Sequence, residues 1–210
     1  MKTLNLIYFG ILAVLLTNCS GEGNNNSNKN EKINTTIKRD SVELTNLIRQ
    51  AYKWHMEKTI DDFPFKQQDS IFIGIDWNEY QRNIKVLSKT NFFSRDFFLK
   101  HKNIALTLDS SIRKADVSWR NINDGIPIWA SEVDDWCNCQ DYPDNYWKTL
   151  TIDSLIIKDG FAEFKWTWDM KYHGDYKVTA KKEDGKWKIN SLQGYNNYYS
   201  VGYYDKIMNE

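Results

Sequence analysis

Between residues 161 and 192 the chain alternates apolar and polar side chains, and this pattern constrains the fold more than any other feature. One face of the first alternating segment carries Ala162, Phe164, Trp166, Trp168 and Met170. Strict alternation over such a length predicts a half-buried strand. Turn sequences at 158–160 and 183–185 each end in Gly and predict hairpins. The C-terminal third is therefore expected to fold as an antiparallel meander.

Two earlier stretches, 40–60 and 76–108, show the three- and four-residue apolar spacing of amphipathic helices. Asp40 or Ser41 is expected to cap the first helix, and Ser94 is expected to divide the second stretch into two helices. Helices that precede an antiparallel sheet predict an α+β fold, in which N-terminal helices pack on a curved C-terminal sheet.

A long irregular region is expected from residue 118 to 147, because Gly and Pro interrupt it and no period holds. Unstructured connections of this length are often functional. Cys137 and Cys139 lie within it. They could form a disulfide in an oxidising compartment, stay as free thiols, or bind a soft metal, although a lone pair without further ligands argues against a metal. The apolar run 71–75 fits either a strand or buried coil.

The N-terminus has one positive charge, at Lys2, then an apolar run from Leu4 to Leu16 and a cysteine at position 19. The run is shorter than the roughly 20 residues that cross a bilayer as a helix, so it is expected to be a secretory signal. The pattern resembles the lipobox of bacterial lipoproteins. That resemblance implies that residues 1–18 are cleaved and that Cys19 is lipidated, while an ordinary signal peptide with a chance cysteine is the alternative.

A Gly-, Asn- and Ser-rich tract follows, and residues 19–38 are expected to be a lipidated Cys and a flexible tether. Residues 39–210 suit one domain. Removal of the leader leaves 27 basic and 28 acidic residues, a balance that argues against a nucleic-acid partner. The expected partner is a membrane, reached through the lipid anchor. The expected location is the bacterial cell envelope, at the outer membrane, facing either the periplasm or the surface.

Aromatic residues make up 15% of the chain, with nine Trp and twelve Tyr. They could fill the core or line a ligand site. The candidate pocket residues are Tyr52, His55, Asp141, Trp166 and Trp168. Structural alternatives stay open for two of them, because His55 could be a hydrogen-bonded core imidazole and Asp141 could accept backbone amides in a turn.

Four segments carry a family likeness, namely 51–55, 134–136, 139–141 and 184–189. Together they resemble a family of uncharacterised bacterial envelope domains, a domain of unknown function. That family is similar in shape to the cone-like α+β superfamily typified by nuclear transport factor 2 and to cystatin-like folds. The resemblance implies a fold in which a sheet and helices enclose a pocket. It implies no reaction, because the activity of the family is unknown.

The expected function is a non-catalytic binding domain for a small molecule, a glycan or a protein, with no cofactor, no metal and no catalytic residue. No nucleophile elbow, zinc-peptidase helix or phosphate loop occurs in the sequence. Two alternatives stay open. One is a pocket enzyme, such as a hydrolase or isomerase, that uses a buried Asp or His; the other is a toxin-neutralising or structural accessory lipoprotein.

Overall fold

The computed structural model describes residues 23–58, 60–122, 129, 133–140, 142–168 and 176–198. The chain divides into two compact units, residues 1–36 and residues 37–210. Helix α1 (Gly23–Glu57) begins in the first unit and continues into the second, which holds all the other described elements. No helix in the described ranges combines the length and the hydropathy that a membrane crossing requires.

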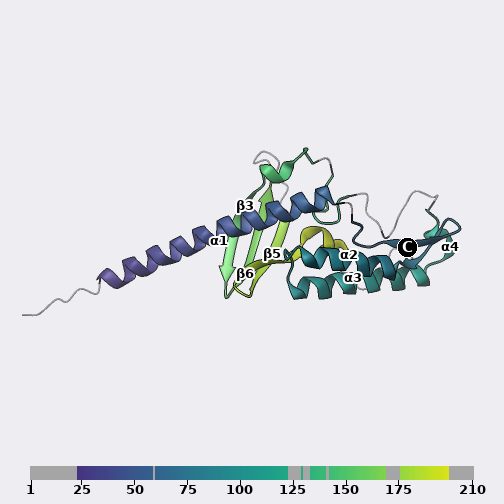
Figure 1. Cartoon of the computed structure of the whole chain (residues 1–210), viewed down its shortest axis with the longest axis horizontal. Helices are drawn as coiled ribbons and strands as arrows, with labels where there is room; N and C mark the ends of the chain where they lie inside the picture. The colour runs from purple at the N-terminus through teal and green to yellow at the C-terminus, as the bar shows by residue number, and fades with distance from the viewer. Residues whose placement is uncertain are drawn as a thin grey trace, which may run out of the picture. The chain divides into compact units, whose positions relative to one another are not determined.

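The second unit has an α+β fold in which helices precede a four-stranded antiparallel sheet, as the sequence predicts (Figure 1). The strands are β3 (Thr151–Lys158), β4 (Phe161–Thr167), β5 (Tyr176–Glu183) and β6 (Lys186–Leu192), and they pair in chain order. The period-two prediction is confirmed in β4, where Ala162, Phe164 and Trp166 are buried. Met170 lies outside the described residues.

From Ile37 onward α1 packs on the inner face of this sheet (Figure 1). The helix presents Leu44, Ile48, Ala51 and Tyr52, which are fully buried and follow the three- and four-residue spacing of one helical face. The sheet contributes Phe164, Trp166, Val178, Ala180, Trp187, Ile189 and Leu192, all buried as well. Burial of these two apolar faces against each other forms the core of the domain.

Asp40 is buried and contacts the sheet, so it is not the helix cap that the sequence predicts. Because α1 begins at Gly23, Asp40 lies inside the helix, and its carboxylate points to the sheet instead of to free backbone amides. The ammonium of Lys182 and the indole N–H of Trp187 donate to Asp40 Oδ1, at 2.9 and 3.0 Å. Burial opposes the charge, but these two donors and the charge of Lys182 outweigh it and lower the pKa of Asp40.

Helices α2 (Trp77–Lys89) and α3 (Arg95–Lys114) run side by side (Figure 1). The predicted division at Ser94 is confirmed, since its side chain accepts the backbone N–H of Phe97. The connector between the two helices extends the sheet beyond β6. Ile189 donates its N–H to the carbonyl of Phe92 and accepts the N–H of Ser94, at 2.8 and 2.9 Å.

The apolar run 71–75 is a strand, β2 (Ile71–Ile75), which pairs with β1 (Phe65–Gln68) in a hairpin that the sequence does not reveal. Gly74 has a φ of +136°, and a Cβ at this position would collide with the carboxylate of Asp109 on α3. The absence of a side chain lets Asp109 accept the N–H of Ile75 at 2.8 Å, which holds the hairpin on the helix.

The structure describes part of the predicted irregular region. It contains α4 (Val117–Arg120), a turn at 134–139 and the 3-10 helix η2 (Tyr146–Lys148); a second 3-10 helix, η3 (Gln193–Tyr198), follows the sheet. Gly125 and Pro127, which helped to define the region, lie outside the described residues.

Replacement of Asp40 by Ala is expected to lower the free energy of unfolding by about 2 kcal/mol, since the buried indole N–H of Trp187 and the part-buried ammonium of Lys182 lose their acceptor. Glu43→Ala is the control, because it removes a carboxylate from the same helix that is about half exposed and whose ion pair among the described residues is with Arg39, at 3.7 Å. The control is expected to cost less than about 0.5 kcal/mol. Urea unfolding followed by tryptophan fluorescence measures both, and equal losses would contradict this role for Asp40.

Candidate functional site

Four of the five predicted pocket residues come together at one end of α1. Ring centroids lie 4.7 Å apart for Tyr52 and Trp166, 5.8 Å for Trp166 and Trp168, and 6.4 Å for Tyr52 and His55. Tyr52 and Trp166 are at most 1% exposed and belong to the core. Asp141 lies outside the described residues.

This aromatic cluster contains buried polar atoms that have no hydrogen-bond partner among the described residues. They are the hydroxyls of Tyr52 and Tyr146 and the indole nitrogen of Trp166. Burial, together with the nearby charge of Asp134, raises the pKa of both tyrosines, while the indole of Trp166 acts in the opposite direction on Tyr52. Both hydroxyls therefore stay protonated at neutral pH and cannot serve as bases.

A tight turn at 134–139 lies against His55. The carboxylate of Asp134 accepts the backbone N–H groups of Trp136 and Cys137, at 2.9 and 3.2 Å, and its own N–H donates to the carbonyl of Cys139. Cys137 and Cys139 are joined by a disulfide and are both buried. Of the three states considered for these cysteines, the structure holds the disulfide.

Asp134 also binds His55, with 2.8 Å between Oδ2 and Nε2. The indole of Trp136 stacks on the imidazole, with centroids 4.0 Å apart and planes 13° from parallel. Burial disfavours the imidazolium, but the hydrogen bond and charge of Asp134, with smaller contributions from Asp62 and Asp135, raise the pKa of His55. The carboxylate partner of His55 is therefore Asp134, which the sequence does not single out for this role.

A second buried pair joins the first through Trp136. Its indole N–H donates to Asp62 Oδ2 at 2.7 Å, and Oδ1 of Asp62 lies 3.3 Å from Nε2 of His101. The hydroxyl of Tyr80 lies 3.0 Å from the other imidazole nitrogen. Burial opposes the charge of Asp62, but the hydrogen bond and charge of His101, helped by His55 and Trp136, lower its pKa. The two Asp–His pairs thus form one internally satisfied network.

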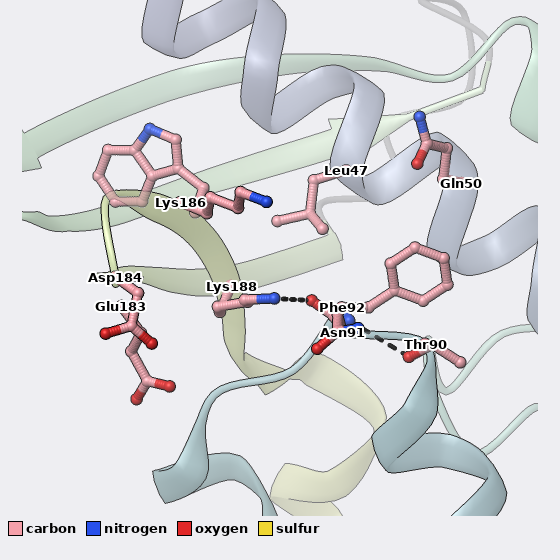
Figure 2. Close-up of a pocket in the computed structure, with 10 residues that line it drawn as sticks. Leu47, Gln50, Thr90, Asn91, Phe92, Glu183, Asp184, Lys186 and Lys188 are labelled. Carbon is pink, nitrogen blue, oxygen red and sulfur yellow. Dashed lines mark hydrogen bonds between the residues drawn. The ribbon is translucent and has the colours of Figure 1, made fainter.

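A groove with a volume of about 510 Å³ lies elsewhere, between α1, the α2–α3 connector and the β5–β6 turn (Figure 2). Leu47 and Gln50 line it from α1, and residues 90–92 line it from the connector. Residues 183, 184 and 186–188 supply the rest of the lining. The volume falls within the roughly 300–1,000 Å³ that is usual for small-molecule sites.

Two lysines of β6 extend across this groove (Figure 2). The ammonium of Lys188 donates to the backbone carbonyl of Asn91, and neither Lys186 nor Lys188 forms an ion pair within the part of the chain that the structure describes. Their positive charges are therefore not compensated by carboxylates.

The two carboxylates at the edge of the groove are paired with residues that do not line it. Glu183 lies 3.2 Å from the ammonium of Lys181 and accepts the backbone N–H of Arg95. Asp184 lies 3.9 Å from the guanidinium of Arg95. The groove consequently has two lysines without an ion pair among the described residues, while Glu183 at its edge shares Lys181 with Asp96 and Asp184 pairs loosely with Arg95.

The sequence analysis missed this groove. The Lys-Trp-Lys segment at 186–188 is visible in the sequence, but the other walls come from residues about a hundred or more positions earlier in the chain. Only the pairing of the α2–α3 connector with β6, and the docking of α1 on the sheet, bring these walls together.

The His55–Asp134 pair predicts a pH-dependent stability. The folded protein holds the His55 proton more tightly than the unfolded chain, whose pKa is 6.5, so this stabilisation is complete below pH 6.5 and is lost as pH rises through the raised pKa. Asp62 acts in the opposite sense, since its contribution is lost as pH falls below 3.8.

Urea unfolding between about pH 5 and pH 8.5 is therefore expected to show a decrease in the free energy of unfolding toward the alkaline end. Asp134→Asn, which keeps the imidazole and removes its charged partner, is expected to flatten this decrease. An unchanged slope in the variant would contradict the assignment.

Within the described residues, no group of His, Cys, Asp or Glu side chains is arranged to hold a metal ion. No protein-family profile matches the chain, and neither a curated protein nor a solved structure is significantly similar to it. Among the described residues, the groove is a candidate binding site.

Proposed function

We propose that this chain is a lipid-anchored binding protein of the bacterial cell envelope, whose domain holds a small polar ligand in the groove and performs no chemistry. The anchor is proposed from the sequence: a short apolar leader ends at Cys19, and a polar tract follows. Attachment through Cys19 would leave the domain at the membrane surface, at the end of that tract.

The observation that carries the binding role is the composition of the groove. Its lining combines apolar surface from Leu47 and Phe92 with the side-chain amide of Gln50 and with two lysines that form no ion pair with any described carboxylate. Ligand sites typically combine apolar walls with a few polar groups that fix orientation. A groove of this kind favours binding over a purely structural role.

The pocket-enzyme alternative is weaker because the acid–base groups are already occupied. Trp136 covers the face of His55, Asp134 accepts two backbone amides as well as the imidazole, and Asp62 accepts from Trp136 and contacts His101. A general base must lie within hydrogen-bond reach of its substrate. These contacts instead hold the 134–139 turn on α1.

Leu47→Trp is expected to fill the groove and abolish ligand binding. The full chain purified from bacterial envelope extract is expected to retain a small-molecule mass in native mass spectrometry, and the variant is expected to lose it. Leu99→Trp is the matched control, because Leu99 is a helical leucine with 63% of its surface exposed and does not line the groove. A mass retained by Leu47→Trp would contradict the groove as the site.

Cys19→Ser is expected to move the protein from the membrane fraction to the soluble fraction and to abolish palmitate labelling, because the acyl chains would have no attachment point. Ser20→Ala, one residue away, is the control and is expected to change neither. A Cys19→Ser protein that stays labelled and membrane-bound would refute the proposed anchor.

A further inference from the structure

We infer that the ligand of the groove is an acidic oligosaccharide, whose carboxylates bind Lys186 and Lys188 while its hydroxyls and sugar rings contact the rest of the lining. The inference rests on the proposed function and names its ligand class. Three observations carry it: the two lysines without an ion pair among the described residues, the side-chain amide of Gln50 and the apolar wall.

The charge of the groove selects an anion. Among the described residues, the ammonium of Lys188 has only the carbonyl of Asn91 as a partner, and the ammonium of Lys186 has no hydrogen bond or ion pair. Glu183 instead pairs with Lys181, which it shares with Asp96, and Asp184 lies 3.9 Å from Arg95. Figure 2 shows both lysine side chains extending across the groove and both carboxylates at its edge. A ligand carboxylate could accept charge-assisted hydrogen bonds from these two ammonium groups.

The remaining groups suit a sugar better than a bare anion. Gln50 is exposed on α1, and its amide makes no hydrogen bond with the described residues, so it can both donate to and accept from hydroxyl groups. Leu47 and Phe92 are half-buried and offer apolar surface to the C–H face of a sugar ring. A simple anion would leave this amide and this surface without a partner.

The two lysines bind a carboxylate or a phosphate alike, so the amide and the apolar wall are what favour a sugar acid over inorganic phosphate. Lysines act as point charges and adapt to carboxylates spaced along a chain of sugars.

The test is isothermal titration of the full chain with tetragalacturonic acid, with its neutral methyl ester, and with inorganic phosphate. Lys186→Gln and Lys188→Gln together are expected to weaken tetragalacturonate binding at least about tenfold, because two charge-assisted contacts are lost. Added salt is expected to weaken the wild-type interaction. Lys102→Gln with Lys114→Gln is the matched control: it removes the same charge from α3, at exposed positions that do not line the groove, and is expected to have no effect.

Two results would overturn the inference and leave the proposed function standing. One is equal affinity for the acid and the methyl ester, unaffected by the lysine variants but lost in Leu47→Trp, which would indicate a neutral ligand. The other is phosphate binding as tight as tetragalacturonate binding, which would indicate an anion site without sugar recognition. If neither sugar binds and native mass spectrometry finds no retained mass in the wild-type chain, both the inference and the proposed function fail.

Discussion

The groove exists because strand β6 binds both α1 and the α2–α3 connector. Asp40 accepts from Trp187 on this strand and from Lys182 on its neighbour, which fixes α1 across the sheet. About two helical turns further along α1, Leu47 and Gln50 then face the same region. Ile189, two residues beyond Trp187, holds the α2–α3 connector through its backbone. One strand therefore positions both walls of the groove and contributes its two lysines.

The second organising feature is the buried network centred on Trp136. This residue stacks on His55 and donates to Asp62, so that it joins two Asp–His pairs that would each be costly to bury alone. A disulfide beside it closes the 134–139 turn. The Asp and His side chains of this network thus attach a loop to α1, and under the proposed function the ligand would contact surface lysines and an amide instead.

The sequence predicted the strands of the C-terminal sheet and the division at Ser94 because their signals are local, but it did not predict that α1 begins at Gly23, inside the polar tract expected to be a flexible tether. The alternation around Phe164 and Trp166, the cap at Ser94 and the glycine turns act over a few residues, and each was correct. Asp40 was misassigned as a cap because its partners lie more than 140 residues away. The β1 strand was missed because its four residues, of which three are exposed, carry no alternation.

The candidate site was less predictable because it depends on contacts between residues that are far apart in the sequence. Periodicity and the likeness to a cone-shaped fold grouped Tyr52, His55, Trp166 and Trp168, and the structure brings these rings together. Neither could reveal that Asp134 binds His55, or that Lys186 and Lys188 have no acidic partner among the described residues, because both facts depend on tertiary pairing. The groove is lined by three segments that are far apart in the sequence, so no local pattern predicts it. The aromatic residues of the cluster, in contrast, recur at regular spacing within a helix and a strand, and this spacing can be recognised in the sequence.

The most direct test of this account is nitrogen–proton NMR of the full chain in mild detergent, recorded while tetragalacturonic acid is added. The account predicts that the largest shifts occur at the backbone amides of Asn91, Phe92 and Lys188 and at the side-chain amide of Gln50. Shifts confined to Trp166, Trp168 and their neighbours would place the ligand at the aromatic cluster instead and would contradict the groove as the binding site.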